Sequence, residues 1–580
     1  MSTHSHPRSP STPFRLSKAS LAEFTPRSIT SLAAGYTRKT FIADALAGVT
    51  VGIVALPLAL AFAIASGVSP DRGLYTAIVA GFIISALGGS RFQIGGPTGA
   101  FVAIIFDIVL RHGYEGLATA TLMAGVLLIL MGIFRFGSMI KFIPYPVTTG
   151  LTTGIALIIF TTQIRDFFGL KIAKLPGHTY DQWMLYFAEA HTFSPATLIL
   201  ASCSLLALIG LRRWNPKLPG AIIVIACGAA AVQLLGISTE SIETIGSRFN
   251  GIPSTLPSPS LPPFSWEKAR LLVPEAIAIA LLAAIESLLS AVVADGMTND
   301  KHSSNGELVA QGLANITSIV FGGLPATGAF ARTATNIKSG AKTPVAGIIH
   351  AATLFLSMLL LAPYASMIPL PSLAAVLVLV AWNISELDHF RSILRAPRSD
   401  VAVLLSTFLL TVLVDITVAV EVGVVMAALL FMKRMSEVAN VVIDTPTLAD
   451  AHPDQPLYHE PDALLTHDIP DSVEIYEITG PLFFGIADRL KDTLNFIEKP
   501  PKAFVLRMRH VPVIDATGLH ALEDFHHKCV RQKTVLILSG VRDPVLRSLK
   551  NIGLWRQIGP ENIHAHIDQA ITRALEIVQA

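Results

Sequence analysis

Glu286 is the residue of this sequence with the clearest chemical potential, because it lies inside the apolar run 271–294. That run is long enough to cross a bilayer. An ionised carboxylate at the centre of a membrane helix costs roughly 2.5–3.5 kcal/mol on insertion scales, so such a residue marks a functional site by default. The alternative is a structural carboxylate that is hydrogen-bonded to a neighbouring helix. The sequence favours a residue that binds a coupling ion.

Two broken apolar segments indicate a binding site for an anion. Pro97-Thr-Gly-Ala-Phe101 recurs as Ala326-Thr-Gly-Ala-Phe330, and a Gly-Gly pair precedes each copy. Short helices that begin in mid-membrane present free N–H groups and the positive end of a helix dipole. Two such ends that face each other form an anion site. Broken segments beside an intramembrane acid are typical of secondary transporters.

The predicted site combines backbone donors, aromatic walls and one cation. We expect the lining to come from Thr98, Gly99, Gly328 and Ala329, and the walls from Phe62, Phe101 and Phe330. Each phenylalanine could instead be an ordinary core or lipid contact. Arg332 would add charge for a dianion, or would pair with Glu286 or with a backbone carbonyl.

Composition places these residues in a polytopic membrane protein. Of 580 residues, 52% are hydrophobic and only 14% are charged, and the mean hydropathy is +0.58. Soluble domains carry about a quarter charged residues. The net charge of +2 gives no case for nucleic acid, and the three scattered cysteines favour neither a disulfide framework nor a metal site. The histidines gather mainly in the tail, the linker and the C-terminal region, without a nucleophile at useful spacing, so we predict neither an enzyme nor a cofactor.

The apolar segments predict fourteen membrane helices. They cover residues 41–66, 72–89, 97–110, 117–134, 146–164, 194–211, 219–236, 271–294, 308–322, 328–341, 343–362, 371–384, 400–415 and 417–433. The two broken motifs occupy the third segment of each group of seven. An odd number of spans in each repeat requires the two copies to be inverted. Lys and Arg in alternate loops favour cytoplasmic positions for both termini.

The remaining chain divides into a tail, a linker and a small domain. Residues 1–40 are Ser/Pro-rich and predict a disordered cytoplasmic tail before the transporter domain 41–435. Residues 436–471 predict a linker, and 472–580 predict a cytoplasmic α/β domain. Its expected strands are 472–478, 504–508 and 534–538, and its expected helices are 485–498, 516–530 and 563–578.

These motifs resemble the SulP family of anion transporters. The resemblance rests on Ala55-Leu-Pro-Leu-Ala-Leu-Ala-Phe62, Gly73-Leu-Tyr-Thr-Ala77, Gly88-Gly-Ser-Arg-Phe92, Ala284-Ile-Glu-Ser-Leu-Leu289 and Asp295-Gly-Met-Thr298. The C-terminal region resembles a STAS domain through Gly480-Pro-Leu-Phe-Phe484 and Asp515-Ala-Thr-Gly518. Gly340 to Pro344 and the stretch 284–316 favour the DauA-like subgroup of proton-coupled C4-dicarboxylate transporters.

The resemblance implies a UraA-like fold of two inverted seven-helix repeats, in which a core domain moves against a gate domain. It also implies a homodimer in a bacterial inner membrane. In sodium-bicarbonate members an Asp and a Thr that bind sodium match Glu286 and Ser290, and a Thr matches Phe330. Glu at the first position and Phe at the last favour a proton over sodium as the coupling ion. Thr517 matches a residue that is phosphorylated in some STAS relatives, although helix capping is the simpler role.

Three functions compete at this point. The first is proton-coupled uptake of C4-dicarboxylates such as succinate, fumarate and aspartate. The second is transport of sulfate or bicarbonate, with sodium as an alternative coupling ion. The third is an anion sensor that signals through the STAS domain to a cytoplasmic protein partner. Radiolabelled uptake under imposed pH or sodium gradients would separate them.

Overall fold

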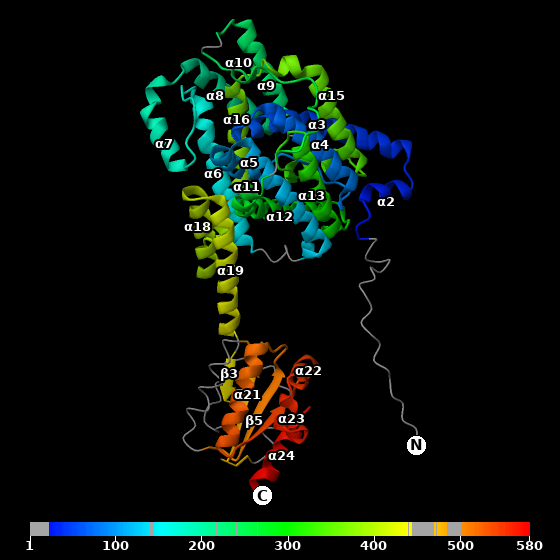
Figure 1. The fold of residues 1–580 in the computed structure, drawn as a ribbon, viewed down its shortest axis with the longest axis vertical. Coiled ribbons are helices and arrows are strands. Elements are labelled where there is room, and N and C mark those ends of the chain that lie inside the picture. Colours follow the sequence, from blue (N-terminus) through cyan, green and yellow to red (C-terminus); the bar gives the residue numbers. More distant parts are fainter. Residues whose placement is uncertain are drawn as a thin grey trace. The chain divides into compact units, whose positions relative to one another are not determined.

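A computed structural model gives the fold of the chain (Figure 1). It describes residues 23–138, 144–215, 218–238, 241–263, 265–438, 440–443, 469–470, 472–483 and 500–579. The chain forms two compact units, Met1–Ala427 and Ala428–Ala580. Each unit is described below by itself.

The described part of the first unit consists of helices, the last of which continues past Ala427 into the second unit, and one short pair of strands. The helices are α2 (Arg27–Ala33), α3 (Arg38–Ala65), α4 (Pro70–Leu87), α5 (Gly99–Ile133), α6 (Tyr145–Phe168), α7 (Thr179–Ala188), α8 (Pro195–Trp214), α9 (Gly220–Leu234), α10 (Ile245–Phe249), α11 (Trp266–Leu271), α12 (Val273–Thr298), α13 (Ser304–Val320), α14 (Phe330–Lys338), α15 (Val345–Ala365), α16 (Leu370–Ile384), α17 (Leu387–Ile393), α18 (Arg398–Leu413) and α19 (Ile416–Val438). Every predicted membrane segment overlaps one of them. The predicted segments 97–110 and 117–134 are joined in α5, which kinks at Gly113, where φ is 68°.

Length and composition show that the chain crosses a membrane several times. Eight helices among the described residues are long and apolar enough to span a bilayer. The shorter α9 and α14 lie below that limit, as expected for segments that are too short to span alone. The total of fourteen spans therefore stays a prediction.

The packing of the helices confirms the inverted repeat. α12 and α13 from the second half of the chain pack against α5 from the first half. In return, α3 and α4 from the first half pack against α15 from the second half. Strand β1 (Gly95–Gly96) pairs antiparallel with β2 (Thr327–Gly328), so the two broken motifs run in opposite directions. The first two helices of each half thus pack against a later helix of the other half, which is the arrangement expected of two inverted copies.

The helices of this unit fall into two groups. The core group contains α3, α4, α5, α12, α13, α14 and α15, and the gate group contains α6, α8, α16 and α18. Within the gate group, α6 packs against both α16 and α18, and α16 packs against α8. The groups meet where α5 contacts α6 and where α3 contacts α16. This division agrees with the core and gate domains that the resemblance implies.

The predicted tail is wrong for residues 23–37, because this stretch is folded onto the core group. The Arg27 amide donates to the Gly88 carbonyl at 3.0 Å. The Ser303 hydroxyl donates to the Glu23 carbonyl at 2.6 Å, and the Asn305 amide donates to the Glu23 carboxylate at 2.6 Å. Residues 23–30 therefore bridge the turn after α4 and the turn before α13.

The second unit contains a five-stranded sheet with the strand order β3-β4-β5-β6-β7. Its strands are β3 (Asn440–Ile443), β4 (Val473–Thr479), β5 (Ala503–His510), β6 (Val535–Ser539) and β7 (Ile563–His564). All neighbours pair in parallel except β3, which pairs antiparallel with β4. The helices are α21 (Ala516–Arg531), α22 (Asp543–Asn551), α23 (Leu554–Ile558) and α24 (Ile567–Gln579). This agrees with the predicted α/β domain.

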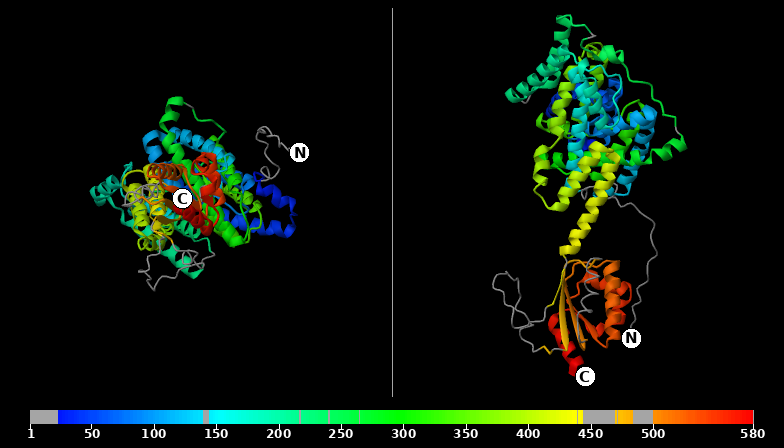
Figure 2. Two further views of the ribbon diagram at one scale, coloured as in Figure 1. Left: turned by 90° about the horizontal axis from the view of Figure 1, so that it is seen from below. Right: turned by 90° about the vertical axis from the view of Figure 1, so that its left-hand side faces the viewer.

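Alternation along β5 explains how the sheet is covered on both faces. Phe504 and Leu506 pack with α21, α22 and α23, whereas Ala503 and Val505 pack with α24. Figure 2 shows the ribbon of the sheet with helices beside it. Successive strand residues point to opposite faces, so a strand buried on both sides reads as a continuous apolar run. The predicted linker is wrong at residues 440–443, which form the edge strand β3. The predicted helix 485–498 lies outside the described residues.

Candidate functional site

The two broken motifs meet at the β1–β2 pair. Gly95 lies opposite Gly328, and Gly96 lies opposite Thr327. α5 begins at Gly99 and α14 begins at Phe330, directly after these strands. The antiparallel pair therefore brings two helix N-termini to one place in the core group, as the sequence predicted. The first amides of each helix have no partner inside the helix and carry its positive dipole end.

Side chains from neighbouring helices fix each motif in place. The Asn315 side chain of α13 donates to the Ala326 carbonyl and accepts from the Ala326 amide, both at 2.9 Å. On the other motif, the Thr333 hydroxyl accepts from the Ile94 amide at 3.1 Å. The Asn336 amide donates to the Phe92 carbonyl at 2.9 Å. Side chains of α13 and α14 thus bind backbone groups that the interrupted helices of both halves leave without partners.

One face of α12 holds β2 and α14. The hydroxyls of Ser287 and Thr327 lie 2.7 Å apart, and the Thr327 hydroxyl also donates to the Ala283 carbonyl at 3.1 Å. One turn further on, the Ser290 hydroxyl donates to the Thr333 hydroxyl at 3.2 Å. Ser290 is completely buried. The contacts of Ala283, Ser287 and Ser290 define the face of α12 that turns toward the motif.

Glu286 lies at the edge of this face. It is three residues from Ala283 and four from Ser290, a spacing that places side chains on the same side of a helix. Its side chain is half-buried, and among the described residues none forms a hydrogen bond or an ion pair with its carboxylate. Glu386, in the turn after α16, is a second carboxylate near enough for its negative charge to repel that of Glu286. An intramembrane carboxylate without a structural partner is available to bind an ion.

Arg332 joins the two halves of the site. Its side chain is buried, and its Nη2 donates to the Pro97 carbonyl, which immediately precedes the start of α5. Of the alternatives that the sequence left open, the structure shows the backbone carbonyl. Its Nη1 is buried and has no hydrogen-bond partner within the described part of the chain. One edge of the guanidinium is therefore free for an anion.

The predicted backbone donors divide into free and occupied groups. The Gly328 amide donates to the Ser287 hydroxyl at 3.2 Å, and the Ala329 amide donates to the Ile94 carbonyl at 2.8 Å. These hydrogen bonds stabilise the β1–β2 pair, and because they occupy the two amides, neither amide is free to bind a ligand. Among the described residues no side chain caps α14, so the amides of Phe330 and Ala331 at its first helical positions remain for a ligand.

The other predicted residues differ in exposure. Phe101 is completely buried and Phe62 is nearly so, whereas Phe330 is 52% exposed. A methyl group on Gly99 would lie 3.4 Å from the Phe62 ring and 2.6 Å from Cδ1 of Ile384 in α16. Thr98 is the residue before α5, and its hydroxyl is buried without a hydrogen-bond partner in the described structure. Gly99 and Phe62 therefore lie where the core group meets the gate group, and Phe101 belongs to the core packing.

Three functional candidates were missed by the sequence analysis. Gln93 donates to the Ser287 carbonyl at 3.1 Å and lies against Gly328. Ser287 contacts both Gly328 and Thr327, as described above. His350 lies completely buried in α15, so the histidines are not confined to the tail, the linker and the C-terminal region. Its position inside an apolar run was the available signal, because ionisable residues in membrane segments are rare and functional.

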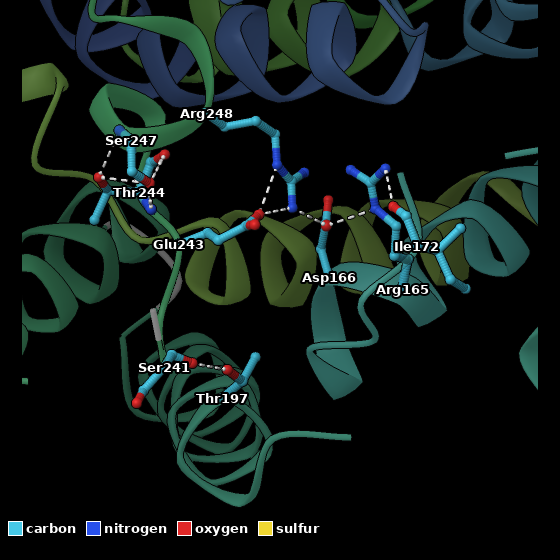
Figure 3. A network of polar contacts seen from close by, with 9 residues as sticks. All are labelled: Arg165, Asp166, Ile172, Thr197, Ser241, Glu243, Thr244, Ser247 and Arg248. Atoms are coloured by element: carbon cyan, nitrogen blue, oxygen red, sulfur yellow. Dashed lines mark hydrogen bonds and ion pairs between the residues drawn. The ribbon is translucent and has the colours of Figure 1, made fainter. Parts of the chain in front are cut away.

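A second polar cluster lies at the end of α6 (Figure 3). Asp166 accepts from Arg165 at 3.0 Å and from Arg248 at 2.8 Å, and Arg248 also pairs with Glu243. Burial disfavours the charge of the Arg248 guanidinium, but Asp166 and Glu243 outweigh this effect and raise the pKa of Arg248. The cluster ties the loop around α10 to the gate group. It also lines a cavity of about 450 Å³ together with Phe106 of α5.

The STAS-like unit has a different helix cap from the one predicted. The Asp515 carboxylate accepts from the Gly518 amide at 2.7 Å and caps α21. Thr517 is exposed in the first turn of that helix, so it is not the capping residue.

Comparison with known proteins assigns the chain to a family. Residues 41–407 match the sulfate permease family, and residues 466–570 match the STAS domain. The chain therefore belongs to the sulfate permease family of membrane anion transporters and carries a C-terminal STAS domain. This confirms the family resemblance of the sequence, which covers both units.

Individual relatives agree with this assignment. The chain is 40% identical to the putative sulfate transporter YvdB of Bacillus subtilis, over 92% of this chain and 98% of that protein. It is 28% identical to the bicarbonate transporter BicA of a Picosynechococcus strain, over 92% of this chain and 94% of that protein.

Solved structures share the fold. The murine Slc26a9 anion transporter in its inward-facing state superimposes with a TM-score of 0.84 at 18% identity, over 98% of this chain and 96% of that chain. The transmembrane domain of a cyanobacterial BicA gives a TM-score of 0.59 at 28% identity, over 68% of this chain and 98% of that chain.

Proposed function

We propose that this protein imports C4-dicarboxylates such as succinate, fumarate and aspartate together with protons by alternating access, with dianions such as succinate as the reference substrates. The dianion would bind between the N-termini of α5 and α14. Glu286 would carry the coupling proton. The core group would then move against the gate group and expose the site to the other side of the membrane.

The observation that carries this proposal is the position of Glu286. Its carboxylate has no hydrogen-bond or ion-pair partner in the described structure, yet it lies on α12 beside the face that holds β2 and α14. An ionised Glu286 and a bound dianion repel each other, and the repulsion grows as water is excluded. Protonation of Glu286 removes it. Proton and dianion therefore raise each other's affinity by the same factor.

Arg332 supports a dianion rather than a monoanion as the substrate. Its guanidinium is buried and offers Nη1 without a protein partner among the residues that the structure describes. A buried charge is costly unless it is paired. A bound anion supplies that pair, and a second negative charge can be met by the amides at the start of α5 and α14.

Sulfate or bicarbonate is the second candidate substrate, because relatives of this chain are named as transporters of these anions. Helix N-termini and a guanidinium accept any small anion, so the polar groups of the site fit them as well. Sodium is the alternative coupling ion for this candidate, with Glu286 and Ser290 as ligands. An anion sensor that signals through the STAS domain is a weaker third candidate.

Several features of the assembly belong to the same proposal. We expect a homodimer in a bacterial inner membrane, with both termini in the cytoplasm. The STAS domain would regulate the transporter or bind a cytoplasmic protein partner, and would form no part of the substrate path.

The test is radiolabelled uptake by purified protein in liposomes. A panel of succinate, fumarate, aspartate, sulfate and bicarbonate is offered under an inward pH gradient and, separately, under an inward sodium gradient at equal pH. The proposal predicts accumulation of dicarboxylates driven by the pH gradient alone. Accumulation of bicarbonate or sulfate that requires sodium would replace it with the second candidate.

A further inference from the structure

His350 is a buried ionisable side chain of the core group. Its side chain is completely buried in α15. Neither Nδ1 nor Nε2 has a hydrogen-bond partner among the described residues. Buried polar groups in proteins nearly always have a partner, so an orphaned group of this kind calls for a functional explanation. The imidazole is also the side chain best suited to exchange a proton near neutral pH.

The surroundings of His350 bring it close to the anion site. A methyl group on Gly81 of α4 would lie 4.0 Å from Cδ2 of His350 and 3.2 Å from the Gly95 carbonyl. A methyl group on the next residue of β1, Gly96, would lie 2.7 Å from Nη1 of Arg332. Consecutive Cα atoms are about 3.8 Å apart. His350 and the free edge of the Arg332 guanidinium therefore lie close to successive residues of the same strand.

Burial in the core group and the positive charge of Arg332, which lies beside the same strand β1, both disfavour a proton on the His350 imidazole of the empty site. α3 and α4 pack against α15, and their charged residues lie at least about two helical turns from the positions that face His350: Arg38, Lys39, Asp44, Asp71 and Arg72. α3 meets the backbone of His350 at Gly52, and α4 approaches its ring at Gly81. The buried acid of α3, Asp44, lies two turns away and accepts from the Lys342 and Thr343 amides at 2.6 and 3.0 Å.

We propose that His350 is a second proton-binding residue of the transporter, which takes up a proton when a dianion binds beside Arg332. This inference rests on the proposed function and adds a second coupling proton to it. In the empty site the positive charge of Arg332 opposes a proton on the neighbouring imidazole. A bound dianion neutralises the charge of Arg332, and its second negative charge attracts a proton to the imidazole of His350. Proton and dianion then favour each other's binding reciprocally.

The two proton sites together fix the charge that moves in one transport cycle. One proton resides on the Glu286 carboxylate and one on an imidazole nitrogen of His350, and both leave with the dianion on the far side of the membrane. The two positive charges balance the two negative charges. Transport of a dianion by the intact protein is therefore electrically neutral, whereas transport with one proton would move one negative charge.

The experiment measures this balance in liposomes that contain the full chain. Succinate uptake at pH 7.5 is driven by an inward pH gradient while valinomycin and potassium set the membrane potential. We expect uptake by the parent protein to be independent of the potential. We expect His350→Gln to take up succinate more slowly when the interior is negative, and each tenfold proton gradient to support about tenfold accumulation instead of about a hundredfold. His112→Gln, a histidine of α5 outside the site, is the matched control and should behave like the parent protein.

The outcomes separate this inference from the proposed function. Absence of any proton-driven dicarboxylate uptake by the parent protein would overturn the proposed function itself. Proton-driven uptake that carries net negative charge in the parent protein would overturn only the role of His350, and this measurement needs no variant. The role of His350 is also overturned if folded His350→Gln remains insensitive to the potential. A purely structural role of His350 would change the rate or the stability but not the charge balance.

Discussion

Substitution of Gly328 by alanine should damage the anion site out of proportion to its size. A methyl group on Gly328 would collide with Nε2 of Gln93 and would lie 2.6 Å from Cδ and 3.2 Å from Cγ of the same side chain. Gln93 must then move and lose its 3.1 Å bond to the Ser287 carbonyl. Ser287 also binds the Gly328 amide, so the backbone of Gly328 resists the shift that would relieve the collision.

The magnitude follows from two costs. Overpacking of a close-packed site costs about 1–3 kcal/mol. Leaving a buried polar group of Gln93 or Ser287 unsatisfied costs about 1–3 kcal/mol more. If the variant needs roughly 2–4 kcal/mol of free energy to restore the binding geometry of the site, substrate affinity falls about 30- to 1,000-fold.

The assay is succinate binding and uptake by purified variants, with folding checked by size-exclusion chromatography. Gly296→Ala is the matched control, because a methyl group there, on α12, meets nothing within 4 Å. Gly99→Ala should fall between the two, because its methyl group meets the flexible end of Ile384. A folded Gly328→Ala protein with the affinity of the parent would refute the assignment of the site to the β1–β2 pair.

Three further changes test other parts of the account. Arg332→Gln should weaken binding of a dianion about tenfold or more, because a hydrogen bond to a charged group contributes about 1.5–3 kcal/mol. Binding of a monoanion should weaken less. Equal losses of affinity for both anions, measured by calorimetry, would argue against direct contact between Arg332 and the anion. Asp166→Asn should lower the thermal stability in detergent by roughly 1–3 kcal/mol, whereas Glu243→Gln, at a carboxylate that is 53% exposed, should cost no more than about 1 kcal/mol. Burial raises the pKa of the Cys529 thiol to about 12, so this residue should resist maleimide at pH 8 until the STAS unit unfolds. Cys203 and Cys227 are exposed and are replaced by serine for this test, and rapid labelling of Cys529 in the folded protein would contradict its placement.

The sequence predicted the centre of the site because its signals are local. An acid in an apolar run, paired Gly-Gly breaks and the repeated Thr-Gly-Ala-Phe motif each follow from what a bilayer tolerates. The relation between the two motifs also followed, since an odd number of spans forces inversion. The structure confirmed that relation through the antiparallel pairing of Gly95 with Gly328.

Features that depend on contacts between distant residues were not predictable in the same way. Residues 23–37 mix polar and apolar side chains without a long apolar run, and their order comes from bonds to the turns at Gly88 and Ser303. Strand β3 is only four residues long and depends on pairing with β4. The importance of Gln93 arises from its contact with Ser287, nearly two hundred positions away.

Two local details could not be predicted for a different reason. Gly328 and Ala329 are still expected to line the site, but Ser287 and the Ile94 carbonyl occupy their amides, which leaves the next residues of α14 as the candidate donors. Thr517 was expected to cap α21, but Asp515 precedes it and its carboxylate reaches the Gly518 amide. In both cases the motif was located correctly, and the choice between adjacent residues required coordinates.

The most direct test of the central claim is succinate transport by Glu286→Gln in liposomes. The amide mimics the protonated carboxyl, so we expect this variant to bind succinate and to exchange internal for external succinate at a rate close to that of the parent protein. We also expect it to lose the part of the accumulation that the Glu286 proton drives, about tenfold for each pH unit of inward gradient. If Glu286→Gln accumulates succinate to the same ratio as the parent protein under the same gradient, Glu286 does not carry a coupling proton and the account is contradicted.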